Sequence, residues 1–147
     1  LLEERDAVLV RKTGKTGIIS DVKTAAYPGF PTDCQAILTA ALLRAEGESR
    51  IEETVFEDRF HHVPELQKLG AKLEIYHNTV HISGVRTLSG AKLTARDLRG
   101  GAALVLAAMQ AEGESRVEGL THIDRGYERF AEKLRALGAN IERCFDA

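Results

Sequence analysis

The sequence has no tryptophan, one methionine and two cysteines, and none of its apolar runs is long. Cys34 and Cys144 lie far apart and fit no zinc-ligand spacing, so we expect neither a zinc site nor a disulfide framework. A membrane-spanning helix needs roughly 20 consecutive apolar residues, and no stretch of this chain approaches that length. These absences lead us to expect a cytosolic, cytoplasmic protein with no membrane partner.

An excess of charge of one sign is also missing. The chain has 20 Lys and Arg residues against 22 Asp and Glu residues, for a net charge of -2. This balance gives no overall basic field that would attract nucleic acid or an acidic membrane, so neither is expected as a partner. Any anion-binding site must therefore be local. With 147 residues, 44% of them apolar, the chain can form one domain with a sizeable core.

The strongest pattern that is present is an internal duplication. The segment Ala-Glu-Gly-Glu-Ser-Arg at residues 45–50 recurs letter for letter at residues 111–116. Three further matches keep nearly the same spacing: Asp33 with Asp97, Asp58-Arg59 with Asp124-Arg125, and residues 69–71 with residues 137–139. A repeat of this length indicates one supersecondary unit that is built twice.

The first copy contains a helix that is apolar on nearly all sides, at residues 33–45, followed by a strand at residues 50–55. A second helix is expected at residues 60–69. Strands at residues 72–76 and 79–83 then pair across a His77-Asn78 turn, because apolar and polar residues alternate along them.

The second copy repeats this order. We expect a strand at residues 92–95, a buried helix at residues 101–109 and a last strand at residues 140–144. An outer helix lies between the last two, since four apolar residues recur there at helical spacing: Tyr127, Phe130, Leu134 and Leu137. The final strand of this copy would lie beyond the end of the chain.

Before the two copies, residues 7–10 and 18–19 are short β-favouring runs around a hairpin turn at residues 13–17. Gly14-Lys15-Thr16 within this turn does not make a phosphate-binding loop, because that pattern also requires glycine where Leu9 stands. The chain opens with Leu1 rather than methionine, in what resembles the end of a helix, and we interpret it as a piece of a longer protein.

These elements predict an α/β fold with βαβαββ repeats. Since the helices are the apolar elements, we expect buried helices and outward sheets, an inside-out α/β barrel domain of which this chain is a part. Residues 1–20 would be the tail of a preceding repeat, residues 21–86 one repeat, and residues 87–147 a repeat that lacks its last strand.

The stretch Tyr-Pro-Gly-Phe-Pro-Thr-Asp-Cys-Gln at residues 27–35 suggests where the chemistry lies. Its prolines and glycine stiffen a loop that brings Asp33 to the first turn of the buried helix, where the helix dipole favours a negative charge. Thr32 is the expected N-cap. An aspartate in this position can also be no more than a helix-capping charge, and without further information both interpretations stay open.

Four motifs together resemble the enolpyruvyl transferase family, and within it the enzymes that act on UDP-N-acetylglucosamine in the first committed step of peptidoglycan synthesis. They lie at residues 30–35, 54–60, 97–100 and 122–129, and the resemblance covers practically the whole chain. It implies transfer of the enolpyruvyl group of phosphoenolpyruvate to the 3-hydroxyl of UDP-N-acetylglucosamine, with release of phosphate and without a metal or organic cofactor.

The resemblance also implies residue roles. Asp33 matches the aspartate that contacts the sugar 3-hydroxyl and is the candidate base. The phosphate and carboxylate contacts of the family match Arg59, Arg125 and, more weakly, Arg99. Arg125 is, with Asp33, a candidate catalytic residue. The non-functional alternative is that each arginine forms an ordinary surface ion pair with a nearby aspartate: Asp58, Asp97 or Asp124.

Three further substrate-binding residues follow from the same match. Glu57 and Asp97 match neighbours that hold the arginine cluster and help to close the site, and Val55 matches a position whose backbone contacts the sugar nucleotide. The family's acidic cysteine belongs to a loop of the other domain, so Cys34 is expected to be a buried packing residue. The histidines have no spacing that would suit a metal.

The missing upstream domain of the same protein would hold the acid and the remaining cationic contacts, so this chain alone is expected to be inactive. Other functions stay open: the sister transferase of the shikimate pathway, a non-catalytic sugar-nucleotide-binding relative, and, most weakly, an open repeat array.

Overall fold

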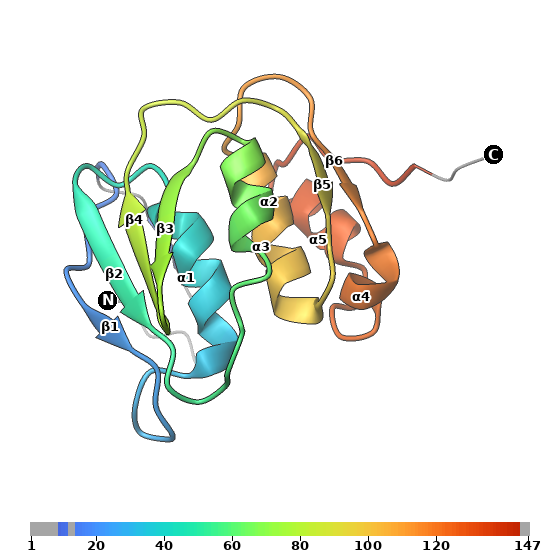
Figure 1. Cartoon of the computed structure of the whole chain (residues 1–147). Coiled ribbons are helices and arrows are strands. Elements are labelled where there is room, and N and C mark those ends of the chain that lie inside the picture. Colours follow the sequence, from blue (N-terminus) through green and yellow to red (C-terminus); the bar gives the residue numbers. More distant parts are fainter. Residues whose placement is uncertain (1–8, 12–13, 145–147) are drawn as a thin grey trace.

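Helices and strands alternate along the chain in two groups, as Figure 1 shows for a computed structural model that describes residues 9–11 and 14–144. The elements in chain order are β1 (Val22–Lys23), the 3-10 helix η1 (Thr32–Cys34), α1 (Gln35–Leu42), β2 (Glu48–Glu52), α2 (Val63–Lys68), β3 (Lys72–Tyr76), β4 (Thr79–Ser83), β5 (Lys92–Thr94), α3 (Leu98–Ala108), β6 (Arg116–Glu118), α4 (Leu120–Asp124) and α5 (Phe130–Ala136).

The strands form two separate sheets. The larger has the order β1-β2-β4-β3, with β1 parallel to β2 and the other pairs antiparallel, and the smaller contains β5 parallel to β6. The predicted hairpin of residues 72–83 is confirmed, and its turn places His77 at a φ of 54°. Leu73, Val80 and Ile82 are buried on one face of it, as the period of two requires.

The helices α1 and α3 pack against each other at the centre of the core. Small side chains such as Ala36, Ala40 and Ala103 allow this close approach, and Gln110 adds a hydrogen bond of 2.9 Å from its Nε2 to the carbonyl of Ala40. Figure 1 shows the four-stranded sheet at one end of the molecule and α4 and α5 at the other, with α1, α2 and α3 between them. The predicted burial is therefore confirmed for α3 and for most of α1, in which Ala41 is exposed.

The two copies of the repeated segment, residues 45–50 and 111–116, share two backbone contacts and a glycine conformation. Ser49 accepts a hydrogen bond of 3.1 Å from the backbone N–H of Ile19, and Ser115 accepts one of 3.3 Å from that of Ala91. The residue after each serine donates its backbone N–H to the carbonyl of the same partner residue: Arg50 to Ile19, and Arg116 to Ala91. The glycine of each copy has a positive φ, 123° in the first and 85° in the second, which only glycine adopts without strain.

The two sheets do not join among the described residues. The structure is therefore a mixed α/β fold, and the barrel that the sequence predicts is not closed in it. None of the described helices has the length and apolar character that crossing a membrane would require.

Two predicted strand regions are wrong. Residues 9–10 and 18–19 are not strands, and Ile19 instead borders β2 through its hydrogen bonds. The other residues of that expected hairpin, 7, 8 and 13, lie outside the described residues, and so does the expected helix end at residues 1–4. Residues 140–144 have no strand beside them within the described chain, so they do not form one. Arg143 in this segment binds Asp124 instead, with bonds of 2.9 and 2.5 Å.

Two local expectations also fail, and one element was missed. Pro31 rather than Thr32 occupies the N-cap position of η1, and the Thr32 hydroxyl faces inward to another partner. Leu137 is 85% exposed because it follows the end of α5 and leaves the apolar stripe. The short helix α4, which begins after Gly119, had no signal in the sequence, since only one of its residues is buried.

Candidate active site

Asp33 lies at the start of the α1 region and is held by two arginines from other parts of the chain. Arg59 donates from Nη2 to Oδ1 at 2.9 Å, and Arg99 donates from Nη2 to Oδ2 at 2.9 Å. The aspartate side chain remains 52% exposed. Hydrogen bonds from Arg99 and then Arg59 hold the pKa of Asp33 below its ordinary value. The fold thus brings together three of the side chains that the sequence singled out.

Arg59 comes from the loop between β2 and α2 and has a second partner. Its Nη1 donates to the Thr32 hydroxyl at 2.6 Å, and its guanidinium lies 4.7 Å from the centre of the Phe56 ring. The neighbouring Asp58 does not pair with it; that residue has a φ of 51° and lies 3.8 Å from His61.

Arg99 extends from the first turn of α3. Besides Asp33 it binds the hydroxyl of Tyr127, with an Nη1 to Oη distance of 3.1 Å, and these two contacts raise its pKa. Asp97 does not contact this guanidinium, because its carboxylate caps α3 by accepting the N–H of Gly100 at 2.7 Å. Asp97 therefore fixes the start of the helix that carries Arg99, and it supports the cluster only in this indirect way.

Arg125 is not bonded to any of the three side chains of this cluster in the described chain. It follows α4, its side chain is exposed, and among residues 9–11 and 14–144 it makes no hydrogen bond or ion pair. Its neighbour Asp124 binds Arg143 instead, which lowers the pKa of that aspartate. The interpretation of the three arginines as ion pairs with nearby aspartates is consequently wrong for Arg59, Arg99 and Arg125 alike.

Glu53 is a buried carboxylate that sequence reasoning missed, although it lies next to this cluster. It is 2% exposed and accepts hydrogen bonds from two threonine hydroxyls and two backbone N–H groups. Burial alone would raise the pKa of Glu53, but these donors, that of Thr32 first, hold it below its ordinary value. A signal did exist: the period of two along β2 places residue 53 on the same inward face as Ile51.

The remaining predicted residues surround the loop after β2. Val55 donates its backbone N–H to Glu53 at 2.8 Å, while its side chain is 43% exposed. Glu57 is exposed and borders an open hollow of about 600 Å³ that Arg59 also lines. Asp33 and Arg99 do not line this hollow, so the candidate site is the three-residue cluster itself and not the hollow.

Cys34 is exposed, which corrects the prediction of a buried cysteine. It lies between Asp33 and α1, on the outer side of the 3-10 turn, where no core residue covers it. No group of three or more His, Cys, Asp or Glu residues in the described chain is arranged to hold a metal ion.

His62 is the buried histidine beside the cluster, and its Nε2 has no hydrogen-bond partner within the described chain. Burial lowers the pKa of His62 from 6.5 to about 4, against a smaller opposing effect of Asp97. The unfolded chain therefore binds a proton between pH 6.5 and about 4 that the folded chain does not bind. Stability contributed by the neutral imidazole is full above pH 6.5 and is lost as the pH falls through this window.

We expect the free energy of unfolding to decrease by about 3 kcal/mol between pH 7 and pH 4 from this residue alone, at about 1.4 kcal/mol for each pKa unit. Urea unfolding followed by circular dichroism at several pH values measures it. The variant His62→Leu should lose this dependence, whereas His61→Leu, at the exposed neighbour, should keep it. Equal pH dependence in both variants would assign the loss to other groups.

Comparison with known proteins identifies the class of protein to which this fold and these contacts belong. A family model described as EPSP synthase (3-phosphoshikimate 1-carboxyvinyltransferase) matches residues 2–134, and the chain belongs to this family. The resemblance seen in the four motifs is thereby confirmed.

Two curated relatives are similar to this chain over most of its length. The chain is 54% identical, over 144 residues, to UDP-N-acetylglucosamine 1-carboxyvinyltransferase 2 of Carboxydothermus hydrogenoformans, covering 98% of this chain and 34% of that protein. It is 58% identical, over 130 residues, to UDP-N-acetylglucosamine 1-carboxyvinyltransferase of Salmonella paratyphi B, covering 88% of this chain and 31% of that protein. The chain thus spans about a third of the length of these relatives.

Solved structures agree on the fold. The enolpyruvyl transferase NikO from Streptomyces tendae matches with a TM-score of 0.77 and 32% identity, over 86% of this chain and 29% of that one. EPSP synthase from Acinetobacter baumannii matches with a TM-score of 0.67 over 75% of this chain and 27% of that one; at 18% identity, this likeness concerns the fold alone.

Proposed function

We propose that the protein containing this chain transfers the enolpyruvyl group of phosphoenolpyruvate to the 3-hydroxyl of UDP-N-acetylglucosamine and releases phosphate. The observation that carries the proposal is the carboxylate of Asp33 shared between Arg59 and Arg99. A base beside two guanidinium groups is what the addition of a hydroxyl to an anionic substrate requires. The names of the relatives support the acceptor sugar, and we propose that the reaction serves peptidoglycan synthesis.

The two arginines restrain the base until the substrate arrives. An aspartate whose pKa is lowered is ionised at neutral pH, but it is also a weak proton acceptor. Phosphoenolpyruvate carries a carboxylate and a phosphate, which suit the guanidinium groups of Arg59 and Arg99. As these arginines turn to the substrate anions, Asp33 loses its hydrogen bonds, its pKa rises, and it can accept the proton of the sugar hydroxyl.

The other candidate residues have supporting roles in this proposal. Arg125 is exposed and has no ion pair within the described residues, so it can contact a further phosphate or carboxylate oxygen. The backbone of Val55 contacts the sugar nucleotide, Glu57 helps to close the site, and Asp97 holds the start of α3. A separate upstream domain supplies the acid that protonates the methylene carbon.

We also propose the larger architecture. Residues 21–86 form one βαβαββ repeat, residues 87–147 form a second that lacks its last strand and in which residues 140–144 become a strand only beside a neighbour outside this chain, and residues 1–20 are the tail of a preceding repeat. With a third such unit, the outward sheets surround the buried helices as an inside-out barrel. The complete protein works in the cytoplasm, on cell-wall synthesis and so on cell shape and division.

The purified 147-residue chain, given both substrates, is expected to release no phosphate, because the proposed acid and part of the anion site lie elsewhere. The complete protein should release phosphate and form the enolpyruvyl ether of UDP-N-acetylglucosamine, detected by mass spectrometry. Turnover by the chain alone would refute the proposed division of the site.

The shikimate-pathway reaction is the second candidate, because the matching family model carries that name. Supplying shikimate 3-phosphate as acceptor in the same assay separates the two reactions. A complete protein that binds UDP-N-acetylglucosamine but forms no product with either acceptor would instead be a non-catalytic relative.

A further inference from the structure

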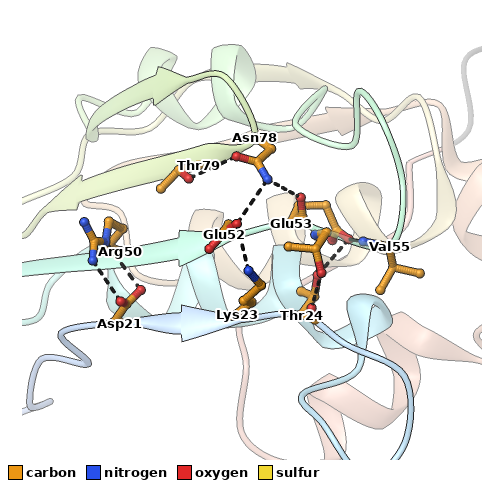
Figure 2. Close-up of polar contacts among 10 residues, drawn as sticks. Asp21, Lys23, Thr24, Arg50, Glu52, Glu53, Val55, Asn78 and Thr79 are labelled. Atoms are coloured by element: carbon orange, nitrogen blue, oxygen red, sulfur yellow. Dashed lines mark hydrogen bonds and ion pairs between the residues drawn. The ribbon is translucent and has the colours of Figure 1, made fainter.

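Glu53 is the one buried carboxylate of the described chain whose partners lead directly to the candidate active site. The other, Glu65, binds Lys68 and the backbone N–H of Thr94, away from Asp33. Glu53 is fixed at its backbone as well: its N–H donates to the carbonyl of Asn78 at 2.8 Å, and its carbonyl accepts from the Asn78 side chain at 3.1 Å. Figure 2 shows the bond from the Asn78 side chain to Glu53, together with Thr24 and Val55.

The two oxygens of Glu53 have different partners. Oε1 accepts the Thr24 hydroxyl at 2.8 Å and the N–H groups of Val55 and Phe56 at 2.8 and 3.2 Å, which fixes the loop after β2. Oε2 accepts a single bond, 2.7 Å from the hydroxyl of Thr32. An ionised carboxylate can only accept, so the proton of this hydroxyl is directed to Glu53.

Because this proton is directed to Glu53, the Thr32 hydroxyl has no hydrogen left to donate to its other neighbour, Arg59. With its hydrogen committed, the Thr32 oxygen can only accept, and it accepts Nη1 of Arg59 at 2.6 Å. The other end of the same guanidinium donates to Asp33 at 2.9 Å. Glu53 and Asp33 are therefore linked through one hydroxyl and one guanidinium: Thr32 donates to Glu53, and Arg59 donates from one end to Thr32 and from the other to Asp33.

We propose that Glu53 is a positioning residue for the site: through the Thr32 hydroxyl it holds Arg59 in the orientation that faces Asp33. It touches no substrate. Its significance for turnover rests on the proposed function, but the position of Arg59 can be measured without turnover, in the 147-residue chain.

The first test is the variant Glu53→Gln, followed by carbon-detected NMR titration of the Asp33 carboxyl. A glutamine amide cannot accept at both ends, so either Thr32 or the loop backbone loses its acceptor. We expect the hold of Arg59 on Asp33 to weaken and the pKa of Asp33 to rise toward its ordinary value. Glu65→Gln is the matched control, since it also removes a buried charge, and it should leave this titration unchanged.

A second pair of variants keeps the test decisive if Glu53→Gln does not fold. Thr32→Val removes the linking hydroxyl at a partly exposed position, and Thr32→Ser retains it. The valine variant should raise the pKa of Asp33 and the serine variant should restore it, whereas adding Glu53→Gln to Thr32→Val should change it no further. An unchanged Asp33 titration in folded Glu53→Gln or in Thr32→Val would overturn the proposal.

In the complete protein, misplacing Arg59 by this route should lower kcat by up to about 100-fold. Turnover of Glu53→Gln at the wild-type rate would overturn the catalytic part of the inference. A wild-type protein without turnover would contradict the proposed function and leave the NMR result to decide the positioning of Arg59.

Discussion

Asp33→Asn in the complete protein is expected to lower kcat by about 100- to 10,000-fold, the usual contribution of a general base. The amide has nearly the same shape as the carboxylate but cannot take up the proton of the sugar hydroxyl. Arg59 and Arg99 would lose their anionic partner and become available to the donor substrate. The KM for phosphoenolpyruvate should therefore stay the same or fall, and steady-state phosphate release measures both constants.

Asp21→Asn is the matched control for this substitution. Asp21 is likewise an exposed aspartate bound to an arginine, 2.8 Å from Nη2 of Arg50, but it lies at the larger sheet and touches none of the cluster residues. Its variant should keep wild-type turnover. If Asp33→Asn retained activity within a factor of ten, the assignment of Asp33 as the base would have to be abandoned.

Leu104→Ala is expected to reduce the free energy of unfolding by about 2 to 5 kcal/mol. Leu104 lies on α3, is 1% exposed and belongs to the largest core cluster, so truncation leaves a cavity that the surrounding helices cannot fill. Since a domain is stable by only about 5 to 15 kcal/mol in total, this loss is a large share. Urea unfolding followed by circular dichroism measures it.

The same substitution at Leu137 provides the comparison, because that side chain is mostly exposed. Leu137→Ala should change stability by no more than about 0.5 kcal/mol. Similar losses in the two variants would contradict burial as the cause of the effect at position 104, because alanine is itself the stronger helix former.

Much of the fold could be predicted because its signals are local. The hairpin of residues 72–83 follows from alternation and a two-residue turn, and the buried helices follow from runs without polar residues. Elements whose formation depends on a neighbouring segment could not be predicted correctly. Residues 140–144 favour a strand but find no pairing partner in the described chain, and α4 has too little burial to leave a pattern.

The candidate site was predictable to a similar extent. The motifs selected Asp33, Arg59 and Arg99, which the fold brings together, but they could not reveal which aspartate each arginine binds. Proximity in the sequence favoured the nearby aspartates, whereas the actual partner of both Arg59 and Arg99 lies 26 or more residues away. Glu53 was overlooked because an acidic residue at the end of a strand is usually assigned to the surface, and only its inward register argues otherwise.

The small side chains between α1 and α3 have a consequence for the spacing of the site. Asp33 and Arg99 sit at the starts of these two helices, so the separation of the helix axes sets how far apart the two charges are. The alanines of this contact, among them Ala36, Ala40 and Ala103, have almost no atoms to give up. Substitutions at these positions can therefore mainly introduce larger side chains. Each larger side chain would push the two helices apart and increase the distance between Asp33 and Arg99, although the substituted residue itself never meets a substrate.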